Sequence, residues 1–381
     1  MNLLKFRKRS LACLLPVIVA AAAVATQANA LEFGANIHIG AQTSEANTQV
    51  AQVMAHRNLK IARMDAWGWA DSAQKAMMRD QISKINASGG KVQLIIHSNR
   101  AWTNACSENL ATVEQDEYNK AYATVGYYKD LVKDFEVLNE VQLDPYIQPE
   151  VPWNQQGDST AGYYGKPCVA RMAAVIKGIT RAIRAHGPGS RVITGVIGRD
   201  YGWLYYLREN GIDWDVTGTH VYLGVNNNIL TDTYFGALKL FPSLARFGKP
   251  ITINEFNCNE KFRSDYENTP GAPVAEQCLV AVKRRLDDIK ANTHGTIESV
   301  VYYELWDQPQ KPVPENRFGL MYNMSRPKTS LYLASAYAGG NLTPAEQYEV
   351  TRRGLLSDAQ IASMKQGGVQ PAPPRVSAHG G

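Results

Sequence analysis

The stretch Phe135-Glu136-Val137-Leu138-Asn139-Glu140-Val141 organises the interpretation of this chain. It begins with aromatic and β-branched residues at the alternating positions that favour a strand. It ends in the polar pair Asn139-Glu140, where a buried strand should leave the core. A carboxylate at the end of a buried strand costs folding free energy unless another group pairs with it, so such a residue often has a functional role. The stretch therefore predicts a core strand that delivers a functional Glu140, although Asn-Glu pairs also end strands without any function.

A second apolar stretch has the same design. Ile251-Thr252-Ile253-Asn254-Glu255-Phe256 has the pattern of a strand, and its glutamate falls near the carboxyl end. Two glutamates at strand ends are the groups that glycoside hydrolysis requires, because one carboxyl group protonates the leaving oxygen while the other attacks the sugar or activates water. This interpretation depends on a fold that brings Glu140 and Glu255 together.

Strand and helix patterns alternate eight times along the chain. The predicted strands cover residues 33–39, 60–66, 92–97, 135–141, 191–197, 214–222, 251–256 and 299–305. The predicted helices cover residues 43–58, 72–85, 114–132, 168–186, 201–210, 233–247, 273–291 and 330–338. This alternation predicts an α/β fold, a (β/α)8 TIM barrel that forms a single catalytic domain over residues 31–340. A doubly wound open sheet is the alternative, but no glycine-rich phosphate-binding turn follows the first predicted strand.

The two ends of the chain differ from this barrel pattern. Residues 1–30 have a basic start, an apolar run over 11–24 and the small residues Ala28-Asn29-Ala30, which together predict a signal peptide cleaved after Ala30. The apolar run is too short to span a bilayer, so we expect a periplasmic or secreted protein with no stable membrane anchor. Residues 341–381 are expected to form a polar tail that carries one or two loose helices and ends in a disordered Pro-rich segment.

The charge of the chain does not favour a nucleic-acid partner. The formal net charge is +5, but the predicted signal peptide contains four basic residues and no acidic residue. Its removal would leave a net charge of about +1, and no basic cluster remains elsewhere. We therefore expect no nucleic-acid binding.

Four cysteines follow the predicted signal peptide, namely Cys106, Cys168, Cys258 and Cys278. An even number in an exported protein indicates two disulfides, for which three connectivities exist. We favour Cys106–Cys168 and Cys258–Cys278, which would join loops rather than core strands. A metal site built from all four cysteines would need closely spaced pairs that the sequence lacks, and we expect neither a metal nor a cofactor.

A (β/α)8 barrel places its active site at the carboxyl ends of its strands. The polar and aromatic residues at these ends of the predicted strands are Arg63, His97, Asn139, Glu140, His220, Tyr222, Glu255 and Trp306. Taken singly, each of them could serve in an internal ion pair or in core packing. At the same end of one barrel, they predict a polar pocket around two carboxylates.

In this order and spacing, these residues resemble the catalytic set of the clan A glycoside hydrolases, which are (β/α)8 barrels with catalytic glutamates after strands four and seven. Within this clan the chain is similar to families 5 and 39. The motifs Thr219-His220-Val221-Tyr222, Phe318-Gly319-Leu320 and Pro327-Lys328 resemble those of bacterial members near family 39, some of which cleave exopolysaccharides. The resemblance implies that Glu140 is the general acid/base and Glu255 the nucleophile of a retaining mechanism.

The resemblance also implies roles for the surrounding residues. Asn139 would donate a hydrogen bond to the sugar 2-hydroxyl, while Arg63 and Tyr222 would hold Glu255. His97 and His220 would orient carboxylates or bind hydroxyl groups, and Trp306 would form the floor of a sugar subsite. Glu140 would need a raised pKa to remain protonated, which repulsion from the second carboxylate would supply.

Eight aromatic residues fall in or near the loops that follow the predicted strands: Trp67, Trp69, Trp102, Tyr146, Trp153, Tyr163, Tyr164 and Trp203. Aromatic faces pack against the apolar C–H faces of sugar rings. We expect two or three of these residues to bind substrate, with Trp102 and Trp153 foremost, and the others to cover the barrel. Their spread over several loops favours a polysaccharide cleft over a pocket for one sugar.

The sequence thus predicts a monomeric, retaining endo-glycoside hydrolase that acts on a β-linked polysaccharide, with a bacterial exopolysaccharide as one candidate. Two alternatives remain open. One is an exo-acting glycosidase of the xylosidase or arabinofuranosidase type, and the other is a catalytically silent barrel that binds polysaccharide.

Overall fold

The computed structural model describes residues 31–38, 43–66, 71–223, 228–231, 233–234, 238–258, 273–311 and 315–366. The predicted signal peptide lies outside these ranges, as does the Pro-rich end of the chain. Within them, no helix combines the length and the apolar character needed to cross a membrane.

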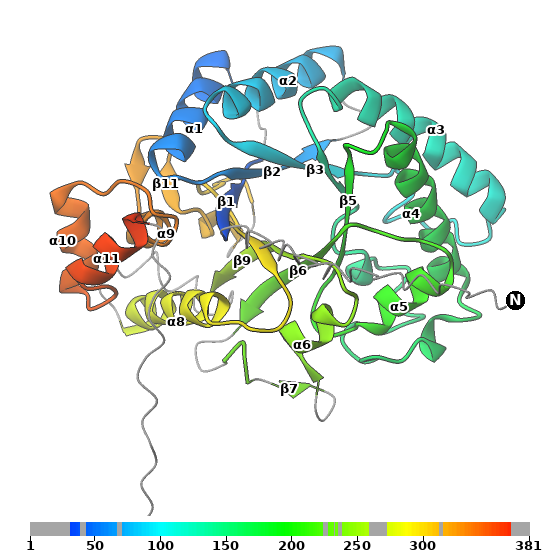
Figure 1. The fold of residues 1–381 in the computed structure, drawn as a ribbon. Helices are drawn as coiled ribbons and strands as arrows, with labels where there is room; N and C mark the ends of the chain where they lie inside the picture. Colours follow the sequence, from blue (N-terminus) through cyan, green and yellow to red (C-terminus); the bar gives the residue numbers. More distant parts are fainter. Residues whose placement is uncertain are drawn as a thin grey trace, which may run out of the picture. The chain divides into compact units, whose positions relative to one another are not determined.

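Within the described residues, eight parallel strands close into a barrel in the order β1-β10-β9-β6-β5-β4-β3-β2, with helices around it (Figure 1). The barrel strands are β1 (Glu32–Asn36), β2 (Ile61–Ala66), β3 (Lys91–Ile96), β4 (Asp134–Val137), β5 (Arg191–Val196), β6 (Val216–Leu223), β9 (Ile251–Cys258) and β10 (Ile297–Tyr302). Each predicted strand has a counterpart among them. The (β/α)8 prediction is therefore confirmed, and the open-sheet alternative is excluded because the sheet is closed.

The helices that accompany the strands are α1 (Ser44–His56), α2 (Ser72–Ala87), α3 (Leu110–Tyr128), α4 (Pro167–Ala185), α5 (Gly202–Glu209), α6 (Leu240–Ala245), α8 (Pro273–Lys290) and α9 (Thr329–Tyr337). Local sequence explains several of their starts. Asp71 and Gln74 form a capping box before α2, Asn109 accepts from the backbone N–H of Thr112 before α3, and Pro167 is the first residue of α4.

The helix predicted over residues 233–247 is wrong in its first half. The chain instead forms the short antiparallel pair β7 (Thr233–Tyr234) and β8 (Leu238–Lys239), and α6 begins only at Leu240. Pro242 explains the late start, because proline removes a backbone N–H and clashes with the preceding turn inside a helix but is tolerated in a first turn. The loops elsewhere contain the 3-10 helices η1 (Val141–Leu143), η2 (Ala161–Tyr163) and η3 (Glu315–Arg317), and the pair β11 (Met321–Asn323) and β12 (Arg326–Pro327).

The hydrophobic core lies between the strands and the surrounding helices. Helix α4 shows the pattern, because five residues at alternating spacings of three and four are all buried, namely Val169, Met172, Ile176, Ile179 and Ile183. Burying each such side chain contributes about 1.5–3 kcal/mol. The inside of the barrel is more polar, since Gln93 of β3 lies between core residues and donates to Thr252 of β9 at 3.4 Å.

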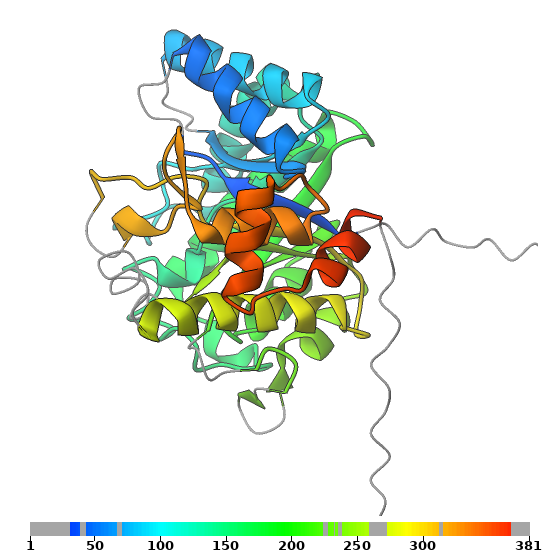
Figure 2. The ribbon, with the colours of Figure 1, turned by 90° about the vertical axis from the view of Figure 1, so that its left-hand side faces the viewer.

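The chain beyond the barrel is packed more firmly than its composition suggests. Helices α10 (Pro344–Arg352) and α11 (Asp358–Lys365) lie beside α9 (Figure 2) and bury Val350 and Ile361. The Arg57 guanidinium donates to both carboxylate oxygens of Glu346, at 2.8 and 2.6 Å. Residues 344–352 and 358–365 therefore form docked rather than loose helices, and residues 367–381 lie outside the described ranges.

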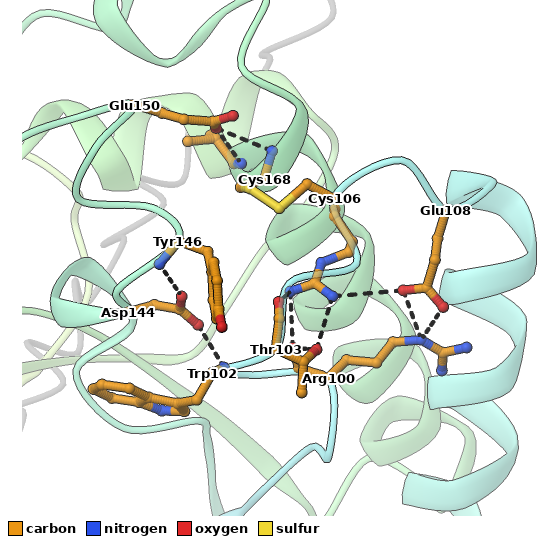
Figure 3. Close-up of a disulfide and its surroundings, with 11 residues drawn as sticks. Arg100, Trp102, Thr103, Cys106, Glu108, Asp144, Tyr146, Glu150 and Cys168 are labelled. Carbon is orange, nitrogen blue, oxygen red and sulfur yellow. Dashed lines mark hydrogen bonds and ion pairs between the residues drawn. A yellow bond between two sulfur atoms is a disulfide. The ribbon is translucent and has the colours of Figure 1, made fainter.

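Both favoured disulfides are present. The Cα atoms of Cys106 and Cys168 are 4.5 Å apart, and those of Cys258 and Cys278 are 5.9 Å apart, within the range of native disulfides. The first joins the loop after β3 to the start of α4 (Figure 3), and the second joins the end of β9 to α8.

Each disulfide is expected to stabilise the fold by about 2–5 kcal/mol. In the chain-entropy account, the Cys106–Cys168 link should contribute about 1 kcal/mol more, because its sequence separation is 62 rather than 20. Denaturant unfolding of the two double Cys→Ala variants measures this difference. Alkylation of the unreduced protein should label none of these four cysteines, and labelling of all four would refute the assignment.

Candidate active site

Glu255 enters the site because β9 carries one residue more than its neighbour. Thr219 of β6 pairs with Ile253, but the next residue of β6, His220, pairs with Glu255. Asn254 is the extra residue, and a bulge of this kind re-aims the side chains that follow it. The Glu255 carboxylate, only 5% exposed, therefore lies beside the His220 ring.

Glu140 reaches the same place through a sharp turn rather than along a strand. Strand β4 ends at Val137, so the strand predicted to continue to residue 141 is four residues too long. Leu138 and Glu140 have φ values of 61° and 45°, which residues other than glycine seldom adopt. Backbone strain of this type concentrates at functional sites. The turn brings Oε1 of Glu140 within 2.7 Å of Nδ1 of His220.

The two glutamates are close neighbours around this histidine. One oxygen of Glu140, one oxygen of Glu255 and one ring nitrogen of His220 all lie within 4.8 Å of one another. Many catalytic zinc sites likewise have three protein ligands. A cation is disfavoured here because Arg63 already brings a positive charge onto Glu255.

Both oxygens of Glu255 accept hydrogen bonds from the residues for which this role was predicted. Nη1 of Arg63 donates to Oε1 at 2.7 Å, and the hydroxyl of Tyr222 donates to Oε2 at 2.7 Å. Burial and the charge of Glu255 hold the pKa of Tyr222 well above its ordinary value, so Tyr222 remains a donor. These contacts fix the direction in which the carboxylate points.

Arg63 also binds an acid that sequence analysis did not assign to the site. Its Nε and Nη2 atoms donate to the Glu136 carboxylate at 2.6 and 2.7 Å, and both side chains are almost fully buried. Burial lowers the pKa of Arg63, but the charges of Glu136 and Glu255 outweigh it and raise the pKa. The signal for Glu136 was visible, since a charged residue inside an apolar strand needs a buried partner.

Two asparagines complete the contacts of the Arg63 guanidinium. Asn36 of β1 accepts from Nη1 at 2.8 Å, and Asn139 accepts from Nη2 at 2.8 Å. Because the Asn139 oxygen faces Arg63, its orientation is set by the same guanidinium that holds Glu255. Sequence analysis missed Asn36 because it predicted the first strand to continue to residue 39, which placed Asn36 inside the strand, whereas β1 ends at Asn36.

The pKa of Glu140 departs from its expected direction. Burial raises the pKa of Glu140, but the hydrogen bond and charge of His220 outweigh burial and lower it. Burial lowers the pKa of His220, but the charge of Glu255 and the bond to Glu140 outweigh it and raise it. The proton of this pair therefore lies on the imidazole. Sequence analysis expected His220 to orient a carboxylate or bind a hydroxyl group, but for the pKa of Glu140 it considered only the repulsion between the two carboxylates.

His97 belongs to a second network beside the first. Its Nε2 lies 2.8 Å from Oδ1 of Asp65, whose Oδ2 lies 3.1 Å from Nδ1 of His38. Burial raises the pKa of Asp65, but the hydrogen bonds of His38 and His97 outweigh it and hold the pKa far below its usual range. His38 continues the network to Glu304 at 3.4 Å. Burial raises the pKa of Glu304 to about 7.

A cleft of about 530 Å³ reaches Asn139, the residue before Glu140. Its lining includes His97, Leu138, Asn139 and Trp102, whose side chain is 53% exposed. Trp153 is also exposed, at 42%, but it is not part of this lining.

The remaining aromatic residues divide by burial. Tyr163 and Trp203 are buried and pack on Tyr206, which gives them the covering role. Trp67 and Trp69 lie outside the described residues. Trp306 is partly buried against the core, and its backbone pairs with Met321. Tyr303, which directly follows β10, contacts Tyr222 with the ring centroids 6.3 Å apart. Sequence analysis did not assign Tyr303 to the site.

Comparisons with known proteins agree on the fold. No protein-family model matches the chain, and no curated protein sequence is significantly similar to it. Its structure is similar to a family 39 glycoside hydrolase from Bacteroides cellulosilyticus (TM-score 0.55, 13% identity, 81% of this chain and 63% of that chain covered). It is also similar to a β-glucosidase from Thermotoga maritima (TM-score 0.53, 10% identity, 86% and 99% covered).

A third similar structure is an exo-β-1,4-mannosidase from an Opitutaceae bacterium (TM-score 0.54, 15% identity, 85% and 60% covered). The chain thus spans less than two thirds of the length of the family 39 enzyme and of the mannosidase. The chain has the (β/α)8 barrel fold that these glycoside hydrolases share.

Proposed function

We propose that this protein is a retaining glycoside hydrolase that cleaves β-linked polysaccharides within the chain. The observation that carries the proposal is the approach of Glu140 and Glu255, whose nearest oxygens lie within 4.8 Å. Retaining glycosidases place their two carboxyl groups about 5–5.5 Å apart, whereas inverting enzymes need about 6.5–9.5 Å to admit a water. The similarity in fold to glycosidases supports the same class of reaction.

The surrounding contacts support a different role for each glutamate. Glu255, held by Arg63 and Tyr222, is the charged and oriented carboxylate, and it attacks the anomeric carbon. Glu140, the more accessible of the two, donates a proton to the leaving oxygen and later removes one from the incoming water. Two displacements at the same carbon give net retention.

The proton for the leaving group is held by the His220–Glu140 pair. In the free protein it lies on His220, whose pKa is raised, and the hydrogen bond of 2.7 Å connects it to Glu140. When the leaving oxygen develops negative charge beside Glu140, the proton moves through Glu140 to that oxygen. Asn139 lies next to Glu140 in sequence and is available for the sugar 2-hydroxyl.

The proposal also specifies that cleavage occurs within the polysaccharide rather than at its end. The cleft extends from His97 and Asn139 to the exposed Trp102, which gives room for sugar residues beyond the reacting one. We further propose that the protein acts as a monomer after export to the periplasm or medium. The two disulfides support export, because such bonds persist in oxidising compartments.

The test is incubation of the purified protein with β-glucan, mannan, galactan, xylan and bacterial exopolysaccharides, followed by product sizing and a proton NMR time course. We expect oligosaccharides of several lengths early in the reaction, and the β anomer to appear before mutarotation. Early release of monosaccharide alone would indicate an exo-acting enzyme, and initial α anomer would indicate inversion. Polysaccharide binding without new reducing ends would indicate a silent barrel.

A further inference from the structure

The exposed Trp102 is not a loose side chain of a loop. Its residue lies between β3 and α3, and its φ of 66° is in the left-handed region that tryptophan seldom adopts. Leu138, which lines the same cleft, has a φ of 61°. Residues persist in such conformations only where the surrounding structure over-determines them. Contacts with the surrounding structure therefore hold Trp102 in this conformation.

The first contact comes from the loop that carries Glu140. Asp144, only 1% exposed, accepts the backbone N–H of Trp102 at 2.6 Å and that of Tyr146 at 2.9 Å (Figure 3). A carboxylate buried this deeply is costly unless its oxygens are hydrogen-bonded. Because Asp144 follows Glu140 by four residues, this bond ties the Trp102 backbone to the segment of the proposed acid/base.

The second and third contacts come from α4. Cys168 and Arg171 are three residues apart and therefore lie on one face of the helix. Arg171, 1% exposed, donates to the carbonyls of Arg100 and Thr103 at 2.8 and 2.7 Å, and to the Thr103 hydroxyl at 3.0 Å. The Cys106–Cys168 disulfide reaches the same loop from the start of α4 (Figure 3). The loop is thus held before and after Trp102.

We propose that Trp102 is a preformed platform for a sugar residue at a subsite away from the scissile bond, and that Asp144 is its positioning residue. The inference rests on the proposed function and names a subsite within it. An indole face packs on the C–H face of a pyranose, and a platform that is already ordered loses little side-chain freedom when the sugar binds. Only a substrate long enough to reach Trp102 gains from this contact, so the platform selects chains over single sugars.

The experiment compares substrates of two lengths. The probes are the β-1,4-linked hexasaccharides of glucose, mannose, galactose and xylose, and the matching 4-nitrophenyl β-monosaccharides. For Trp102→Ala, we expect the ratio of kcat/KM on the hexasaccharide to kcat/KM on the monosaccharide to fall about 5- to 10-fold, through KM. Tyr348→Ala is the matched control, because Tyr348 is an aromatic residue of α10 that is 66% exposed, and it should not change the ratio.

A double-mutant cycle separates positioning from general stability. Asp144→Ala should lower the same ratio, but in the Trp102→Ala background it should have no further effect, because it acts through the indole. Asp144→Asn, which keeps one acceptor oxygen, serves if the alanine variant does not fold, and the Cys106→Ala/Cys168→Ala variant extends the cycle. The inference would be overturned by an unchanged ratio in Trp102→Ala, or by an effect of Asp144→Ala that is the same with and without Trp102. Either result would leave the proposed hydrolysis standing.

Binding is measured separately, so that the two proposals can fail separately. Isothermal titration calorimetry with the same hexasaccharides measures binding to the unmodified protein and to Trp102→Ala. Binding that weakens in Trp102→Ala supports the platform even if no hexasaccharide is hydrolysed, in which case the proposed hydrolysis alone fails. Absence of binding and of hydrolysis in the unmodified protein would overturn both.

Discussion

Glu255→Gln is expected to remove turnover of every glycoside, by at least about four orders of magnitude in kcat. The amide cannot attack the anomeric carbon, and Glu140, the other carboxylate of the cluster found among the described residues, is the proposed acid/base. Glu136 lies nearby, but both of its oxygens are taken by Arg63 inside the barrel. The measurement is single-turnover hydrolysis of an aryl glycoside, which reports formation of the glycosyl-enzyme directly.

The fold should survive this change. Glutamine has the shape of glutamate, and its side-chain oxygen can still accept from Tyr222 or Arg63. Arg63 keeps its two bonds to Glu136, so the buried guanidinium is not left without a negative partner. Glu349→Gln on α10 is the matched control, and it should retain full activity. More than about one percent residual activity in Glu255→Gln would remove Glu255 from the nucleophile's role.

Glu140→Gln is expected to reduce hydrolysis of natural chains by about 10²- to 10⁴-fold, the usual contribution of a general acid. An aryl glycoside with a nitrophenolate leaving group needs no proton, so glycosylation of Glu255 by this substrate should be nearly unaffected. The second step still needs a base, and the glycosyl-enzyme should therefore accumulate as a burst. Equal losses on both substrates, without a burst, would contradict the assignment.

His220→Asn tests whether His220 holds the proton that Glu140 delivers to the leaving oxygen. In the unmodified protein the pair titrates as a unit, and its proton is lost only as the pH rises through the raised pKa of His220. The alkaline limb of kcat/KM should therefore lie above about pH 6.5. Without His220, the acid is Glu140 alone, and the limb should move to lower pH. An unmoved limb in His220→Asn would show that the imidazole does not hold the proton.

The sequence by itself determined the eight barrel strands, most of the helices, and the end of the barrel at which the polar residues gather. Strand alternation and helix periodicity are local signals, because they depend on side chains within a few turns or a few strand positions. The closed barrel then follows from the order of elements. In the same way, the Asn139-Glu140 pair and Glu255 could be identified, since a carboxylate at the end of an apolar strand is visible without coordinates.

Tertiary structure alone decided how these groups act on one another. Arg63 binds Glu136 across 73 residues of sequence, His220 binds Glu140 across 80, and Asp144 holds Trp102 across 42. Charge interactions and hydrogen bonds change steeply with distance and burial, and no local pattern fixes distances across such separations. For this reason the sequence located Glu140 but gave the wrong direction for its pKa, which the nearby imidazole lowers.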